Sequence, residues 1–342
     1  MLRAISSPVM LQVITLTLGM WTLSATAKNY DWPLPEKTSL TVNIPRGALL
    51  ITTRVDGKQE VSLDLQKVAI ARESSLNSRK ITGDIPSEEP VWAVNGTNAT
   101  LSFPRPADID LQKVTGVTAV LFLPANGEVQ INGTLSDIYL RNTTNTLRVK
   151  VVDGKVSAQK GSAGNVSIDV LNGSITTESM KSNLSLKLRG GIITDKGSQG
   201  EIDVDLINGD LRLNSSAKTL HIKQITGKQT IDARACEIFT NDLQTGSSEI
   251  QLGSALKKGK IVSAGGEITA FIADDWQGKI IAEGIGGNNI INYLSEIRPI
   301  AATPPFTDER LSLTQGTKPD AQLTLSTVGG VLTLQHPQQT GK

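Results

Sequence analysis

A glycine recurs every 18 to 20 residues through the middle of this 342-residue chain, and this repeat restricts the fold more than any other feature. Each glycine follows a short segment of alternating apolar and polar residues, as in Val166-Ser-Ile-Asp-Val-Leu-Asn-Gly173. The repeat glycines are Gly154, Gly173, Gly191, Gly209, Gly227, Gly246 and Gly266. A constant period of this length is typical of proteins that stack one structural unit on the next.

Within each unit the pattern of side chains has a period of two. Counted from the repeat glycine, positions −7, −5 and −3 are apolar in most units, and position +2 is apolar again. This alternation predicts a strand with one buried face. Asn172 and Asn208 precede their glycines, and such Asn-Gly pairs tolerate positive φ angles in a tight turn. One unit is therefore predicted to be a strand, a sharp corner, a second strand and a loop.

Two topologies fit such a unit, an antiparallel meander and a parallel solenoid, and the outward position −4 favours the second. This position alternates in charge through six consecutive units: Lys150, Asp169, Lys187, Asp205, Lys223 and Asp242. In a solenoid these six residues would form one column with about 4.8 Å between coils, and each Lys would lie between two Asp. Exposed ion pairs contribute only about 0–1 kcal/mol each, so the column would specify register more than it would stabilise the fold.

The predicted fold is therefore all-β: a single-stranded parallel β-helix, or solenoid, with about 18–20 residues per coil. Residues 28–105 are predicted to form an N-terminal β cap, strand-like but outside the repeat register, and residues 106–295 the solenoid. Residues 296–342 begin with an irregular loop, because Pro299, Pro304 and Pro305 interrupt it. The closing strands are predicted at 323–326 and 331–334, where they would cover the open edge of the stack.

Residues 1–27 have the pattern of a cleaved signal peptide. Arg3 precedes an apolar stretch from about Val9 to Leu23, and small residues at Ala25 and Ala27 precede Lys28. A membrane anchor is the alternative, but the run is shorter than the ~20 apolar residues that a spanning helix needs. We expect an exported protein with no transmembrane span after cleavage.

Two segments of the sequence resemble the opening and closing motifs of a known family. They are Leu121-Phe-Leu-Pro-Ala-Asn-Gly-Glu-Val-Gln-Ile-Asn-Gly133 and Leu325-Ser-Thr-Val-Gly-Gly-Val-Leu-Thr-Leu334. The family consists of exported bacterial domains of unknown function labelled "putative adhesin", and the likeness covers most of residues 39–335. The resemblance implies a β-solenoid in an exported bacterial protein, and it implies no catalytic residues.

The sequence offers few residues for chemistry. Lys and Arg number 34 against 33 Asp and Glu, and this neutral balance argues against binding to nucleic acid. Cys236 is the only cysteine and is predicted to be a small buried residue. Of the two histidines, His221 is predicted at outward position −6 beside Ser185 or Asp203, and His336 lacks a catalytic context. We therefore predict no catalytic, cofactor-binding or metal-binding residues and no cofactor.

A polysaccharide lyase or hydrolase is the alternative function, because such chemistry needs grouped carboxylates. The candidates are Asp203 with Asp205, and Asp274 with Asp275 beside Trp276, whose ring could stack on a sugar. The outward strand pattern and a solvated loop explain both pairs without catalysis. We predict instead a non-enzymatic scaffold or adhesin-like binding surface in the bacterial cell envelope, in the periplasm or at the cell surface. Its partner would be an unknown envelope protein or polysaccharide, and the six-residue charged column is the first candidate surface.

Overall fold

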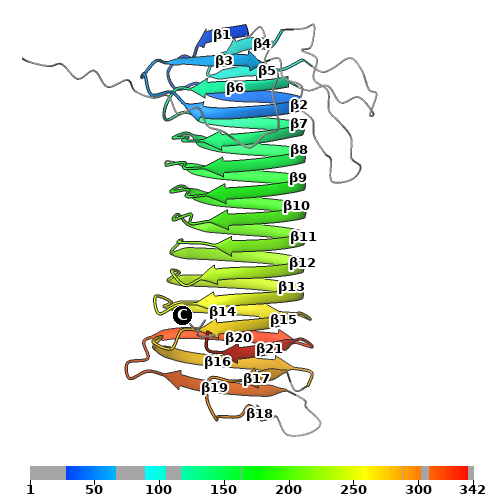
Figure 1. Cartoon of the computed structure of the whole chain (residues 1–342), viewed down its shortest axis with the longest axis vertical. Helices are drawn as coiled ribbons and strands as arrows, with labels where there is room; N and C mark the ends of the chain where they lie inside the picture. The colour runs from blue at the N-terminus through cyan, green and yellow to red at the C-terminus, as the bar shows by residue number, and fades with distance from the viewer. Residues whose placement is uncertain are drawn as a thin grey trace, which may run out of the picture.

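The computed structural model describes residues 28–66, 89–104, 117–162, 164–287, 289–301 and 308–337. These residues form 21 strands of one large, mostly parallel sheet, and no helix occurs among them (Figure 1). Within these ranges there is accordingly no helical segment able to cross a bilayer. The predicted signal peptide at residues 1–27 lies outside the described residues. The all-β prediction is confirmed.

The regular part of the sheet is a stack of seven strands, each 13 to 15 residues long. They are β7 (Glu128–Arg141), β8 (Thr146–Gln159), β9 (Asn165–Glu178), β10 (Asn183–Lys196), β11 (Ile202–Asn214), β12 (Thr219–Ala233) and β13 (Ile238–Leu252). Neighbouring strands pair in parallel, and paired residues are 18 or 19 positions apart in the sequence. The meander is therefore excluded for this part of the chain.

Each long strand turns a corner at its repeat glycine. In β9, Ile168 and Val170 are buried before Gly173, whereas Ile175 and Thr177 are buried after it. The buried positions change from odd to even distances from Gly173, whose φ is 137°. The two halves of the strand therefore face one common interior, and their apolar side chains belong to a single core. The predicted corner is present, but pairing along the sheet continues through it.

Glycine is required at the corner because neighbouring backbones come very close there. A Cβ atom at Gly191 would lie 1.8 Å from the carbonyl oxygen of Gly173, and a Cβ at Gly209 would lie 1.8 Å from that of Gly191. The φ angles of Gly191 and Gly209 are 134° and 144°, a region that side chains disfavour. The corner glycines pair with one another from strand to strand, so each unit of the stack needs glycine at this position.

At the N-terminal end, one strand from early in the chain lies inside the stack. β2 (Ser39–Thr53) pairs in parallel with β7 on one side. On its other side it pairs in parallel with β5 (Asn98–Ser102) and β6 (Val117–Leu123). The sequence predicts this segment outside the repeat register, whereas Val42 of β2 shares a column with Ile131. The relationship is hidden in the sequence because 89 residues separate Asn43 from Asn132, its hydrogen-bonded neighbour in the stack.

Three further strands cover this end of the stack. They are β1 (Lys28–Pro33), β3 (Glu60–Gln66) and β4 (Val91–Asn95). Their pairings, β1 with β3, β3 with β6 and β4 with β5, are all antiparallel. They end the parallel arrangement, as the edge of a sheet requires.

A second insertion occurs at the C-terminal end. β14 (Lys258–Ser263) and β15 (Glu267–Ile272) continue the stack below β13. The next layer is formed by the last strands of the chain, β20 (Ala321–Val328) and β21 (Val331–Gln335). β16 (Gly278–Ile285) and β17 (Ile290–Asn292) follow on their far side (Figure 1).

The end of the stack is formed by two antiparallel strands, β19 (Glu309–Gln315) against β16 and β18 (Ile300–Ala301) against β19. The sequence predicts closing strands at residues 323–326 and 331–334. The structure has strands there, but they lie within the stack rather than at its edge. We call β2 and the pair β20–β21 the inserted strands.

Candidate functional site

The six residues of the predicted charged column lie on top of one another in the structure. Lys150 pairs with Asp169, Asp169 with Lys187, Lys187 with Asp205, Asp205 with Lys223, and Lys223 with Asp242. All six are exposed. The alternation ends at Asn132 on one side and at Val262 on the other. We call these six residues the charged ladder; its stacking follows the predicted register, and a binding role for it is still a prediction.

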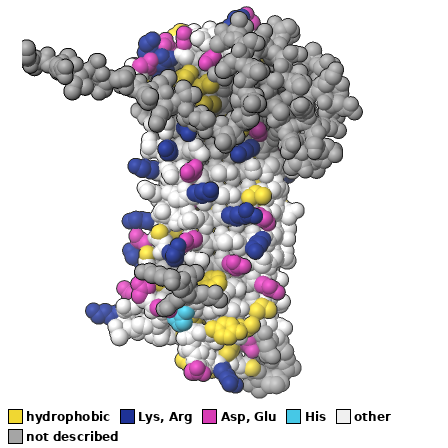
Figure 2. Space-filling view, in the orientation of Figure 1, with side chains coloured by type: hydrophobic (Ala, Val, Ile, Leu, Met, Phe, Trp, Pro, Cys, Tyr) yellow, Lys and Arg dark blue, Asp and Glu magenta, His cyan; other side chains and the backbone are white. Residues whose placement is uncertain are grey.

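The charges of the ladder are balanced but not paired with one another. Within the described part of the chain, no ion pair of 4.0 Å or less joins two of its members. Figure 2 shows acidic and basic side chains interspersed along the visible face of the stack. Unpaired exposed charges add little to stability, so the ladder's ammonium and carboxylate groups are available to a ligand.

A shallow groove of about 680 Å³ lies over the ladder on β10 to β14. One side of it is formed by position −6, which carries hydroxyl, carboxylate, imidazole and ammonium groups. The members of this column on the five strands are Ser185, Asp203, His221, Thr240 and Lys260. No Phe, Tyr or Trp side chain lines this groove among the described residues. The groove can therefore bind by hydrogen bonds and charge rather than by ring stacking.

On the other side of the ladder, position −2 carries exposed aliphatic side chains on β8, β9, β11 and β12, whereas on β10 it is the exposed Arg189. Val152, Leu171, Ile207 and Ile225 are 46%, 36%, 39% and 43% exposed, and we call them the apolar ridge. A second groove, of about 610 Å³, runs between the ladder and this ridge, with Lys150, Asp169 and Leu171 in its lining. Sequence reasoning missed the ridge, although apolar residues beside the buried position −3 were its signal. Aligned exposed aliphatic groups are typical of interaction surfaces.

The structure places Trp276, Asp274 and Asp205, which were considered for polysaccharide cleavage, in three different settings. Trp276 is 1% exposed, and its indole N–H donates to the carbonyl oxygen of Leu256 at 2.9 Å. The ring is part of the core and cannot stack on a sugar, as the polysaccharide alternative would require. Asp274 contacts His336, with 2.6 Å between Oδ1 and Nδ1. Asp205 lies between Lys187 and Lys223 in the ladder, as expected from the strand pattern.

Three aromatic rings stack at the N-terminal end of the molecule. The ring centroids of Tyr30 and Trp32 are 5.4 Å apart, and those of Trp32 and Trp92 are 5.2 Å apart, with nearly parallel planes. These partly buried rings pack against the core. Because both faces of the Trp32 ring are occupied by its neighbours, this group serves packing rather than sugar binding.

Cys236 is fully buried, as predicted. Its Sγ–H donates to the carbonyl oxygen of Ala217 at 3.1 Å. Burial raises the pKa of the thiol to about 12. The thiolate needed for nucleophilic chemistry is therefore strongly disfavoured.

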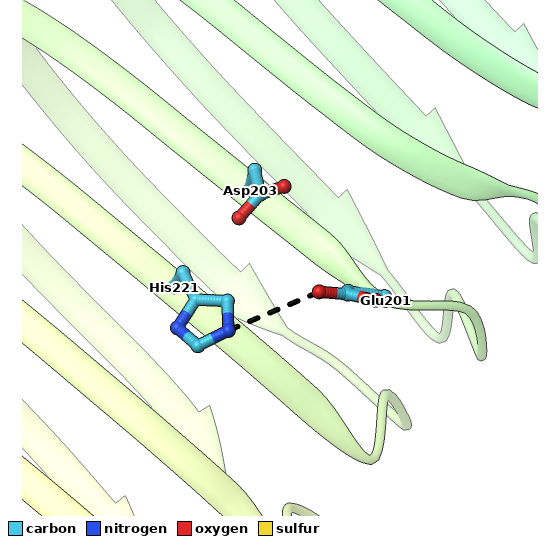
Figure 3. Close-up of side chains that lie close together, drawn as sticks. All are labelled: Glu201, Asp203 and His221. Carbon is cyan, nitrogen blue, oxygen red and sulfur yellow. Dashed lines mark ion pairs between the residues drawn. The ribbon is translucent and has the colours of Figure 1, made fainter.

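His221 lies beside Asp203 on the neighbouring strand, as the repeat predicted. Glu201, immediately before β11, completes a group that sequence reasoning missed. The imidazole Nε2 of His221 lies 3.9 Å from a carboxylate oxygen of Glu201. The ligand atoms of Glu201, Asp203 and His221 all lie within 4.8 Å of one another (Figure 3).

No protein-family model matches this chain, and no curated protein matches it. Three solved structures are similar, each with 10% sequence identity. A "putative cell adhesion protein" from Clostridium sporogenes ATCC 15579 has a TM-score of 0.29 over 92% of this chain and 100% of its own. A "putative adhesin" from Bacteroides fragilis NCTC 9343 has a TM-score of 0.31, with coverages of 91% and 98%. A "putative lipid binding protein" from Parabacteroides distasonis ATCC 8503 has a TM-score of 0.35, with coverages of 90% and 96%.

Two of these names agree with the family that the sequence resembles. Because all three TM-scores are below 0.5, these similarities do not assign a function to this chain.

Proposed function

We propose that this chain is an exported, non-enzymatic β-solenoid, with one coil of 18–20 residues per repeat, that presents a binding surface in the bacterial cell envelope. Its place would be the periplasm or the cell surface, as the predicted signal peptide and the family resemblance suggest. The observation that carries the proposal is the charged ladder, exposed, unpaired and held in register beside the apolar ridge.

The parallel stack makes this surface rigid. Every ladder residue lies on a strand that is paired on both sides, and the glycine corners fix the distance between strands. A ligand that fits the surface therefore loses little free energy in ordering the backbone, and the remaining cost is that of ordering the exposed side chains. A scaffold of this kind binds through rows of equivalent side chains rather than through one deep pocket.

The chemistry of the surface favours a protein partner over a polysaccharide. The apolar ridge offers aliphatic contact area, and the ladder offers alternating charges that fix the register of an extended partner. Recognition of sugars generally gains from stacking on Trp, Tyr or Phe, and none of these rings lines the groove over the ladder within the described chain. An envelope polysaccharide is the second candidate, favoured by the hydroxyl groups of Ser185 and Thr240 in the groove.

The test compares two matched triple variants in pull-downs from envelope extract. The ladder variant is Lys187→Gln, Asp205→Asn and Lys223→Gln. The control neutralises the same number of charges beyond the glycine corner: Lys155→Gln, Asp210→Asn and Lys228→Gln. We expect wild type and control to retain the same protein and the ladder variant to lose it. Equal retention by the ladder variant would contradict the proposal.

The enzymatic alternative is tested on the same protein. Incubation with a panel of envelope and plant polysaccharides is followed by assays of reducing ends and of ultraviolet absorbance. Products that accumulate with wild type and not with Asp203→Asn would establish an enzyme and overturn the non-enzymatic reading. We expect no products, because the Trp276 ring beside Asp274 and Asp275 is buried in the core and is not available to a sugar.

A further inference from the structure

Three side chains of metal-ligand type converge on the groove over the ladder. Asp203 on β11 and His221 on β12 are direct neighbours across the parallel pair. Glu201 lies two residues before Asp203, so its side chain emerges on the same side of the sheet. Figure 3 shows the carboxylate of Glu201 directed toward the imidazole of His221, with the Asp203 carboxylate beside them. All three side chains are accessible to solvent.

The group is a departure from the repeat. The equivalent triangle one strand earlier consists of Asn183, Ser185 and Asp203, and two strands earlier of Asn165, Ser167 and Ser185. Apart from Asp203 itself, these two triangles consist of hydroxyls and amides, so the combination of two carboxylates with an imidazole is particular to Glu201, Asp203 and His221. Across the described residues, Glu201, Asp203 and His221 form the one group of three or more His, Cys, Asp or Glu side chains close enough to hold an ion.

The position of Glu201 is fixed by the neighbouring strand β10. Its backbone N–H donates to Oδ1 of Asn183 at 3.1 Å, and its carbonyl oxygen accepts from the backbone N–H of Leu184 at 2.8 Å. Asp203 and His221 are held by the parallel pairing of β11 with β12. The backbone of the three residues is therefore ordered without a ligand, and only side-chain rotations remain for ion binding.

We propose that Glu201, Asp203 and His221 bind one zinc ion, with water completing the coordination. Zinc takes histidine nitrogen and carboxylate oxygen at about 2.0–2.2 Å, which places ligand atoms somewhat closer together than the present 4.8 Å limit. Small rotations about the side-chain bonds supply the difference. The imidazole favours zinc over calcium or magnesium, which prefer oxygen ligands throughout.

The site departs from the sequence expectation of no metal, because spacing in the sequence does not show contacts between coils. It is independent of the proposed protein-binding function. Lys187 and Lys223 lie in the next column and are not ligands, so neutralising the ladder leaves the three zinc ligands in place.

The experiment is a titration of the full chain with Zn²⁺ alone by isothermal calorimetry, and with Co²⁺ by visible absorbance. We expect one ion per chain. His221→Ala and Asp203→Asn should each weaken binding by at least about tenfold. The matched controls, His336→Ala for the histidine and Asp205→Asn for the carboxylate, should bind one ion as wild type does. The substituted residues are exposed or half-buried, and circular dichroism checks that each variant is folded.

The outcomes separate this proposal from its alternatives. Unchanged stoichiometric binding in His221→Ala, or loss of binding in His336→Ala, would overturn it, since the ion would then lie elsewhere. No saturable binding of Zn²⁺ to wild type would also overturn it. His221→Ala removes a zinc ligand and leaves the ladder intact, whereas Asp205→Asn changes the ladder and leaves the zinc ligands in place. Failure of the zinc site and failure of the binding surface are therefore distinguished.

Discussion

Gly190 and Gly191 follow one another in β10 and differ in what a side chain would meet. A Cβ at Gly190 would have its nearest neighbour at 3.5 Å, in Oδ1 of Asn172, whereas a Cβ at Gly191 would collide with the carbonyl oxygen of Gly173. Gly191→Ala should therefore lower the free energy of unfolding by about 2 kcal/mol or more. Gly190→Ala is the control and should change it by no more than about 0.5 kcal/mol. Urea midpoints of the two variants check this, and equal midpoints would contradict it.

Asp195 is an ionisable residue in the interior of the stack. Burial raises the pKa of its carboxyl group, although hydroxyl hydrogen bonds from Ser198 and Thr177 oppose this. A raised pKa in the folded state means that folding favours the protonated form. The stability contributed by this group is therefore greatest at low pH and falls as the pH rises through the folded-state pKa.

Asp195→Asn, which imitates the protonated carboxyl, should consequently unfold at a higher urea concentration than wild type at neutral pH. The advantage should disappear as the pH falls toward 3.8, the ordinary value for an aspartate. Unfolding curves at a series of pH values measure this. A difference between variant and wild type that does not change with pH would show that ionisation of Asp195 is not its cause.

At the scale of the strands, polar residues interrupt the apolar interior between β12 and β13. Asn241 occupies a column whose neighbours are Ile222 and Ile261. Its side-chain amide donates to Oε1 of Gln229 at 2.8 Å, and the hydroxyl of Ser248 donates to the same atom at 2.7 Å. Since all three side chains are buried, each relies on the others for hydrogen bonds.

Asn241→Ile should therefore lower the free energy of unfolding by about 1–3 kcal/mol, because it removes a donor from the buried Gln229. The triple variant Gln229→Ile, Asn241→Ile and Ser248→Ile restores the repeat's apolar pattern and should recover most of that loss. Thermal unfolding of the single and the triple variant tests both expectations. A triple variant less stable than the single one would mean that the polar group is needed for the strands to pack.

The register of β7 to β13 could be predicted from the sequence because its signals are local. The alternation around Ile168 and the positive φ at Gly173 are properties of one unit, and repetition aligns the units. The same logic placed His221 beside Asp203. The repeat did not predict the contact of Glu201 with His221, because Glu201 lies outside the strand pattern. It also did not predict that Asn241 is buried, because a polar residue breaks the apolar pattern that marks buried positions. It also failed for the inserted strands, because their neighbours in the stack are distant in the sequence.

At the scale of the whole molecule, the inserted strands make each end of the stack depend on a distant part of the chain. β20 and β21 supply the layer between β14–β15 and β16–β17. A chain ending at residue 316 would leave β14, β15 and β16 unpaired on one side and would remove the partner of β17. Strand edges exposed in this way pair with other molecules.

We therefore expect the chain truncated at residue 316 to self-associate and to lose stability at its C-terminal end. A chain ending at Pro337 keeps β21 and serves as the control, which should behave as the full chain does. Light scattering coupled to size-exclusion chromatography distinguishes them. A monomeric product ending at residue 316 would show that β16 and β17 can close directly on β14 and β15.

The inserted strands also bear on how the molecule would respond to tension. A stack in sequence order could be peeled from its last coil inward, one coil at a time. Here a force applied along β21 must slide it past β15 and β17 together, so hydrogen bonds on both sides carry the load at once. The same holds for β2 between β7 and the pair β5 and β6. The inserted strands therefore resist extraction by shear, because the hydrogen bonds on both of their sides have to break together. The last coil of a stack in sequence order would instead unpair one hydrogen bond at a time.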